Sequence, residues 1–173
     1  MRIARKFGVL AVAVSSLALL SACGGPPPQA KVAQVQPGEL PAGASWNGVY
    51  FNELYGMLHL VHTGSTIQGK WRRTDGSAWG EMHGEANGNL FRFEWAEYKE
   101  GFVGAAGTTR GKGFFVYKRP AGENVDDRLE GEWGFDDDEL GNPWNCIKQR
   151  NMEPNLSSIG ATIDATGPVG DWE

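Results

Sequence analysis

The stretch Ile67-Gln68-Gly69-Lys70-Trp71 recurs later in the chain as Leu129-Glu130-Gly131-Glu132-Trp133, and Met82-His83-Gly84-Glu85-Ala86 is a weaker copy. In each copy the apolar and small residues occupy one parity of the alternation, and the polar residues occupy the other. Such alternation is typical of a β-strand with one buried face. The repeats therefore predict strands whose glycine and tryptophan positions face the interior of the fold.

Alternating segments of this kind follow one another through the middle of the chain, each joined to the next by a turn. Asp75-Gly76 is a strong hairpin signal, and Asn87-Gly88-Asn89 marks another turn. No connection is long enough for a crossover helix, so consecutive strands must pair antiparallel, and closure of eight strands leaves no exposed edge. The sequence predicts an all-β fold, an up-and-down antiparallel β-barrel of about eight strands, at 46–51, 54–62, 66–73, 79–86, 90–98, 111–118, 128–135 and 144–148.

Glycine within a strand normally weakens it, so the repeated glycines require a reason. A bare position lets the strand bend and lets an aromatic side chain of the neighbouring strand lie across it. In this succession of apolar residue, glycine and aromatic residue, 46–148 resembles small barrels of the avidin and lipocalin type. The resemblance implies a fold. It includes neither a set of biotin contacts nor a lipocalin motif, so it implies no ligand.

The first residues have the features of a secretory signal. Arg2, Arg5 and Lys6 precede an almost unbroken apolar stretch at 7–20, which is too short for a transmembrane helix. Leu20-Ser21-Ala22-Cys23 follows, and here the chain resembles bacterial lipoprotein precursors, whose lipobox these four residues match. The resemblance implies a signal peptide at 1–22, a diacylglycerol thioether on Cys23, and an acyl chain such as palmitate on the new amino group. Several acyl chains anchor a protein stably to a membrane.

The segments on either side of the barrel differ from it in composition. Residues 23–45 are rich in Pro and Gly and lack an apolar period, which predicts a flexible tether after the lipidated cysteine. Gly24 replaces the Asp that favours inner-membrane retention in enteric bacteria, so the lipoprotein resemblance implies the outer membrane of a Gram-negative-type bacterium. The barrel domain is predicted at 46–149, and 150–173 is predicted to form a loose tail or a strap over the barrel.

Charge and cysteine content narrow the possible functions. The formal net charge is −5, and loss of Arg2, Arg5 and Lys6 with the signal peptide would take it to −8. An acidic protein repels phosphate backbones, so nucleic acid is excluded as a partner. With Cys23 lipidated, Cys146 has no partner in the chain. It alternates with Trp144 in an apolar strand, so we expect its thiol to be buried.

The inward aromatic residues are the candidate binding site. Aromatic walls with a few polar groups form many small-ligand and sugar-stacking sites. The alternative is a filled core, because an eight-stranded barrel is just wide enough for its own side chains. The candidate ligand-binding residues are Tyr50, Trp71, Phe91, Phe93, Trp95 and Trp133.

The chain offers no evident metal site or catalytic motif. His59 and His62 point to opposite faces of a strand because their separation is odd, and His83 has no ligand partner at a suitable spacing. Asp136-Asp137-Asp138-Glu139 lacks the alternation and central glycine of an EF-hand, so a solvated hairpin tip is predicted, with weak calcium or partner binding as the alternative. Nucleophile elbow, phosphate loop and HExxH motifs are missing from the sequence. We therefore expect no metal, no cofactor and no catalysis.

These observations predict a lipid-anchored barrel of the cell envelope that acts as a non-catalytic binding or interaction module. Its partner would be an envelope protein, a glycan or a small apolar ligand. The alternatives are a purely structural or assembly lipoprotein of an envelope complex, an integral outer-membrane barrel whose aromatic face points to lipid, and a hydrolase.

Overall fold

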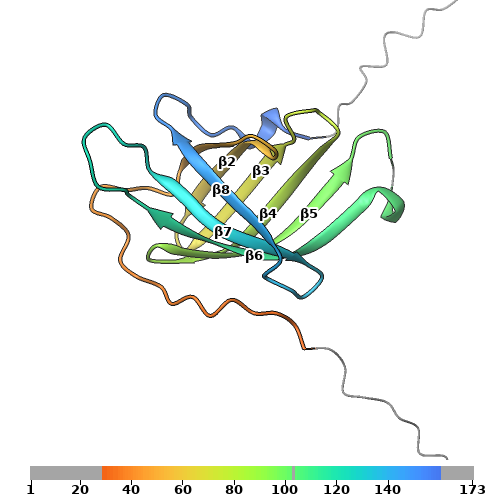
Figure 1. The fold of residues 1–173 in the computed structure, drawn as a ribbon. Coiled ribbons are helices and arrows are strands. Elements are labelled where there is room, and N and C mark those ends of the chain that lie inside the picture. The colour runs from red at the N-terminus through yellow and green to blue at the C-terminus, as the bar shows by residue number, and fades with distance from the viewer. Residues whose placement is uncertain (1–28, 103, 161–173) are drawn as a thin grey trace, which may run out of the picture.

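Eight antiparallel strands close into a barrel in which each strand pairs with the next and β8 pairs with β1 (Figure 1). The computed structural model describes residues 29–102 and 104–160. The strands are β1 (Gly48–Asn52), β2 (Gly56–Thr63), β3 (Thr66–Arg72), β4 (Ala78–Asn87), β5 (Leu90–Lys99), β6 (Thr108–Lys118), β7 (Arg128–Phe135) and β8 (Asn142–Gln149). Two short 3-10 helices are η1 (Ala105–Gly107), between β5 and β6, and η2 (Leu156–Ser158), after β8. Within the described ranges, no helix is both long enough and apolar enough to cross a bilayer.

This architecture confirms the predicted all-β, eight-stranded, up-and-down antiparallel barrel. The strand bounds agree with the predicted ones within two residues, except at the start of β6. Strand β6 begins at Thr108 rather than Gly111, because Thr108, Thr109 and Arg110 continue the pairing with the end of β5. The glycine-rich composition of 99–110 hid this extension from sequence patterns.

Glycines inside the barrel make room for aromatic rings of the adjacent strand. A Cβ atom at Gly111 would lie 2.8 Å from the Trp95 ring, and one at Gly113 would lie 2.7 Å from the Phe93 ring. Both distances are shorter than side-chain atoms tolerate, so these positions must stay bare. The same relation holds for a third directly paired couple, Trp71 and Gly80.

The indoles of Trp71, Trp95 and Trp144 are buried inside the barrel, while the alternate positions, such as Lys70 and Glu130, face outward. An integral outer-membrane barrel requires the reverse, with an apolar band on its outer surface. The observed orientation is therefore the opposite of the one on which the integral-barrel alternative depended.

One end of the barrel, the closed end, is plugged by Trp46. Its ring meets the rings of Phe91 and Tyr117 edge-on, with centroid distances of 5.9 and 5.3 Å. Its Nε1 donates a hydrogen bond of 3.1 Å to the carbonyl oxygen of Gly88, and the Tyr50 hydroxyl donates one of 2.9 Å to the Trp46 carbonyl oxygen. The β2–β3, β4–β5 and β6–β7 connections surround this plug.

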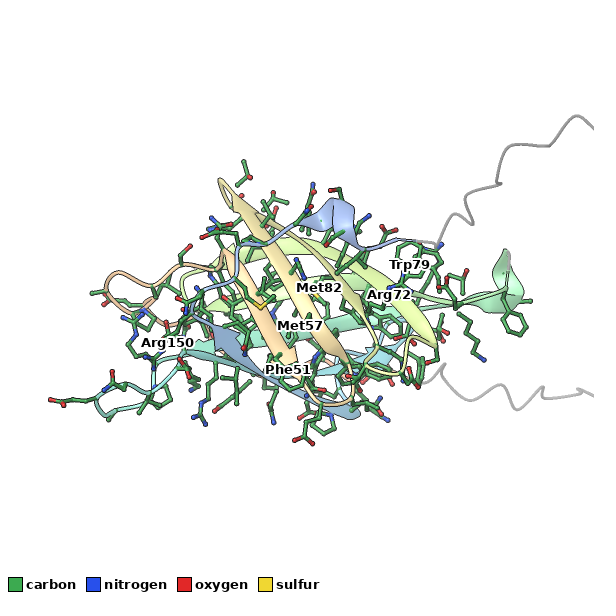
Figure 2. All side chains as sticks on the ribbon, turned by 90° about the horizontal axis from the view of Figure 1, so that it is seen from above. Phe51, Met57, Arg72, Trp79, Met82 and Arg150 are labelled. Carbon is green, nitrogen blue, oxygen red and sulfur yellow. The ribbon has the colours of Figure 1, made fainter. Side chains whose placement is uncertain are left out.

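The opposite end, the mouth, is surrounded by the β1–β2, β3–β4, β5–β6 and β7–β8 connections. In the view from above, Arg72 and Trp79 lie toward the mouth, and Arg150 lies toward the closed end (Figure 2). Among the described residues the two ends thus differ: a tryptophan fills one, and strand ends and turns border the other.

Residues 31–40, here called the N-terminal strap, run along the outside of the barrel from the β7–β8 turn to the closed end (Figure 1). Ala33 is buried against Leu90 and Phe114. Arg92 donates hydrogen bonds of 2.9 and 3.3 Å to the carbonyl oxygens of Ala33 and Val35. The prediction of a flexible tether through residue 45 is therefore wrong for this part of the chain, because packing and backbone hydrogen bonds fix it.

The strap also explains the run of large residues at 114–117 in β6. We expected both faces of β6 to be covered there, with the C-terminal tail as the candidate cover. The strap covers the outer face instead, since Ala33 and Val35 pack with Phe114 and Val116.

The chain after β8 returns over the outside of β2. The Asn155 backbone N–H donates a 2.9 Å hydrogen bond to His59 Nδ1, and Arg72 donates to the carbonyl oxygen of Gly160. Burial under this segment lowers the pKa of His59. Residues 155–160 thus form a strap, and the last part of the predicted tail, 161–173, lies outside the described residues.

The alternation of inward and outward positions along β7 can be tested directly. A Cβ atom at Gly131 would overlap the carbonyl oxygen of Phe114, so Gly131→Val should destabilise the fold by about 2–3 kcal/mol through overpacking. Glu132→Ala, at the adjacent outward position, is the matched control and should cost no more than about 0.5 kcal/mol. Urea unfolding measures both, and equal losses would mean that the inward face has been assigned to the wrong parity.

Candidate functional site: an aromatic pocket at the mouth

The mouth opens into a pocket of about 190 Å³. Since one water occupies roughly 30 Å³ of liquid, this volume holds about six water-sized groups, the scale of a single small ring. The side chains that line it come from the mouth ends of five strands and from the β1–β2 turn. They are Tyr55, Trp71, Arg73, Trp95, Glu97, Thr109, Trp133, Phe135 and Trp144.

Strand register explains why four indoles meet at this level. Trp71, Trp95 and Trp133 each lie a few residues before the mouth end of β3, β5 and β7, and Trp144 lies just after the start of β8. All four occupy the inward parity of their strands. Strands β3, β5 and β7 all run toward the mouth and β8 starts from it, so the four indoles lie inside the same end of the barrel.

The rings pack against one another at steep angles. Trp71 and Trp144 have centroids 5.1 Å apart with planes at 73°, and Trp95 and Trp133 have centroids 5.0 Å apart with planes at 80°. Tyr55 packs on Trp144 at 4.4 Å. Edge-to-face contacts are favoured by the aromatic quadrupole, so the walls hold one another in place.

Three of the indole N–H groups form hydrogen bonds within the walls. Trp133 donates to the Tyr55 hydroxyl at 2.9 Å, Trp71 donates to a Glu97 carboxylate oxygen at 3.3 Å, and Trp95 donates to two backbone carbonyl oxygens. With their donors used in this way, these tryptophans are fixed in orientation. They offer a ligand ring faces rather than N–H groups.

Trp144 is the exception. Its Nε1 is buried and has no hydrogen-bond partner among the described residues. The indole lies near the thiol of Cys146, which is itself buried, as the sequence predicted. Burial raises the pKa of the Cys146 thiol and outweighs the opposing effect of the Trp144 indole, so the thiol stays protonated and is a poor nucleophile.

A bidentate ion pair forms the polar side of the pocket. Arg73 Nε and Nη2 lie 2.9 and 2.8 Å from the two carboxylate oxygens of Glu97. The hydrogen bond to Glu97 raises the pKa of Arg73 and outweighs the opposing effect of burial. The guanidinium also lies 5.6 Å from the centroid of the Tyr55 ring. This pair therefore supplies fixed donor and acceptor groups at the edge of an otherwise aromatic site.

The structure divides the six predicted ligand-binding residues into two groups. Trp71, Trp95 and Trp133 line the pocket. Tyr50, Phe91 and Phe93 lie in the filled core toward the closed end, with exposed fractions of 0, 0 and 3%. Both sequence interpretations are thus present in one barrel, a packed core in one half and a pocket in the other.

Sequence reasoning missed six lining residues, which are Tyr55, Arg73, Glu97, Thr109, Phe135 and Trp144. A parity signal was present for four of them, since Phe135 shares the inward parity of Trp133, and Trp144 shares that of Cys146. Glu97 continues the inward parity of Phe93 and Trp95, and Arg73 continues that of Trp71. A charged residue on the buried parity at a strand end predicts a polar group directed into the barrel opening. Tyr55, in a turn, gave no comparable signal.

The structure also places the histidines and the acidic turn that the sequence singled out. In 29–102 and 104–160, no group of three or more His, Cys, Asp or Glu side chains is placed to hold a metal ion. The acidic β7–β8 turn is only partly the solvated tip that was predicted. Asp137 pairs with Lys112 at 2.8 Å, Asp138 with Lys31 at 3.8 Å, and Glu139 with Arg92.

No protein-family model matches the chain, and neither a curated protein nor a solved structure matches it. Cys23, the predicted site of lipidation, lies outside the described residues. The chemistry of the pocket is therefore argued from its own side chains.

The Arg73–Glu97 pair should contribute measurably to stability because both side chains are largely buried, with exposed fractions of 27 and 16%. A double-mutant cycle with Arg73→Ala and Glu97→Ala is expected to give a coupling energy of about 1.5–3 kcal/mol. The exposed Lys112–Asp137 pair is the control and should give a clearly smaller coupling, because water screens it. A coupling for Arg73–Glu97 no larger than the control would contradict a fixed polar edge.

Proposed function

We propose that the protein is a lipid-anchored, non-catalytic binding protein of the bacterial outer membrane, and that its mouth pocket takes a sugar ring at the end of a glycan. The observation that carries the proposal is the combination of four indoles with one bidentate Arg–Glu pair in a pocket the size of one ring.

A pyranose ring complements both parts of the pocket. Its C–H faces are apolar and flat enough to stack on indole faces, which the wall hydrogen bonds leave free. Its hydroxyl groups donate and accept, and the pocket offers both functions. Glu97 accepts, Arg73 donates, and the hydroxyls of Tyr55 and Thr109 do either.

Two other ligand classes fit less well. A purely apolar ligand would cover the Arg73–Glu97 pair and give it no hydrogen bonds in return, which is costly for buried polar groups. A long acyl chain would need depth, and the barrel below Trp71 and Trp144 is filled by Phe93 and Phe115, whose rings lie 6.4 and 5.3 Å from that of Trp144.

Binding rather than hydrolysis is favoured by the carboxylate content of the site. Most glycosidases use two carboxylic side chains on opposite sides of the scissile bond. Of the described residues that line the pocket, Glu97 alone has a carboxylate, and Arg73 and Trp71 both bind it. Both of its carboxylate oxygens are therefore already engaged within the pocket wall.

The cellular placement rests on the first part of the sequence. The lipobox Leu20-Ser21-Ala22-Cys23 supports a lipid anchor on Cys23, and Gly24 supports sorting to the outer membrane. An anchored barrel with an open mouth suits a protein that captures glycan ends within the envelope.

Titration of tryptophan fluorescence with methyl pyranosides of glucose, galactose and N-acetylglucosamine tests the proposal. At least one of them should give a saturable change, because its ring would lie against the pocket indoles. Trp133→Ala should abolish the change. Trp79→Ala should preserve it, because Trp79 stacks on Tyr98 on the outer face of the barrel. Equal responses of the two variants, or a flat titration with every pyranoside, would contradict binding at the mouth.

A further inference from the structure

We propose that the mouth is the face of the barrel that docks on the phospholipid bilayer, so that the pocket opens toward the membrane surface. This inference rests on the proposed lipid anchor at Cys23. It adds the orientation of the barrel on the membrane. This orientation is argued from the course of the strap and from the distribution of exposed apolar side chains.

The chain that leads to the anchor leaves the barrel at the mouth. The Lys31 backbone N–H donates a 2.8 Å hydrogen bond to Asp138 Oδ1, and the Glu139 N–H donates one of 2.9 Å to the Lys31 carbonyl oxygen. Both partners belong to the β7–β8 turn, which borders the mouth. These two hydrogen bonds therefore hold Lys31 at the mouth end of the barrel.

The length of chain before Lys31 limits how the barrel can be placed. Cys23 precedes Lys31 by eight residues, and eight residues span at most about 29 Å when fully extended. The ten residues of β5 at a tilt near 40° make the barrel wall about 25 Å tall. With the closed end on the membrane, the connecting chain would have to run almost fully extended back along the whole barrel. With the mouth on the membrane, it needs little of its length.

Exposed apolar side chains are concentrated at the same end. Of the seven large apolar residues that are exposed in the described part of the chain, three border the mouth and a fourth, Val32, follows Lys31 beside the β7–β8 turn; these four are here called the apolar rim. They are Val32, Leu54, Phe102 and Phe135, with exposed fractions of 49, 59, 63 and 52%. Clustered exposed apolar residues mark interaction surfaces, including those that contact membranes.

An outward-facing aromatic pair supports this direction. Trp79 and Tyr98 stack at 4.5 Å near the mouth ends of β4 and β5, and Figure 2 places Trp79 at that end of the barrel. Tryptophan and tyrosine are enriched where proteins meet the headgroup region, because their rings are apolar at one end and polar at the other.

The acidic β7–β8 turn does not prevent the approach. Three of its four acids, Asp137, Asp138 and Glu139, form ion pairs with basic side chains, as described above. Pairing reduces the charge that the turn presents to a zwitterionic surface. The bilayer is therefore the occupant that fits the rim, the aromatic pair and the start of the strap together.

Fluorescence quenching in vesicles measures the orientation. The full-length lipidated protein would be reconstituted in phosphatidylcholine vesicles that contain headgroup spin-labelled lipid. A thiol-reactive fluorophore would be attached at Ala105→Cys, in η1 at the mouth, or at Ala121→Cys, in the β6–β7 connection at the closed end. Both positions are exposed, whereas Cys146 is buried and escapes labelling. The label at position 105 should be quenched several-fold more strongly than the label at 121.

Variants distinguish docking through the apolar rim from attachment through the lipid anchor. Leu54→Ser with Phe102→Ser should reduce quenching at position 105 and leave vesicle flotation unchanged, whereas Val125→Ser, an exposed apolar residue at the closed end, should alter neither. Thermal unfolding checks that each variant is folded. Equal quenching at 105 and 121, or no effect of the rim variant, would overturn the docking surface while leaving the anchor and the sugar pocket intact. Failure of the wild-type protein to float, or flotation of Cys23→Ala, would overturn the anchor and this inference with it.

Discussion

The contact between an aromatic ring and a bare glycine on the next strand is the constraint on which the structure depends. Trp95 and Phe93 lie across Gly111 and Gly113, where a single Cβ atom would come within 2.8 Å of each ring. An eight-stranded barrel has little internal width, so large rings fit only where a neighbouring position has no side chain. The glycines that would weaken an isolated strand are therefore what lets this barrel close around its tryptophans.

The same constraint separates the two halves of the interior. Toward the closed end the inward positions hold residues such as Leu60, Ile67 and Phe91, and Trp46 completes the packing. At the mouth the inward parity ends in Arg73 and Glu97, which satisfy each other but present their remaining hydrogen-bonding capacity to the opening. This charged pair does not fill the mouth in the way that apolar side chains fill the closed end, so a pocket the size of one ring remains. If this face meets the bilayer, the sugar that enters would be one presented near the membrane surface.

Much of this could be predicted from the sequence, for physical reasons. Alternation of period two and the turn residues between strands are local properties, so the strands, their order and the inward parity of Trp71 and Trp133 were predictable. The packing of Ala33 and Val35 could not be predicted, because the strap is held by hydrogen bonds from Arg92, which lies 59 and 57 residues later in the chain. Residues 31–40 have the composition of a linker and the structure of a packed segment. The division between filled core and pocket was equally hidden, since parity gives the direction of a side chain and not its depth along the barrel.

The most direct measurement of whether the mouth, and not the core, receives the ligand is the indole N–H spectrum of ¹⁵N-labelled protein titrated with methyl pyranosides. The signals of Trp71, Trp95, Trp133 and Trp144 should shift together, because these four rings line one pocket. Those of Trp46, inside the closed end, and Trp79, on the outer wall, should stay in place. Shifts confined to Trp46 or Trp79, or a spectrum unchanged by every pyranoside, would contradict a ligand-receiving mouth.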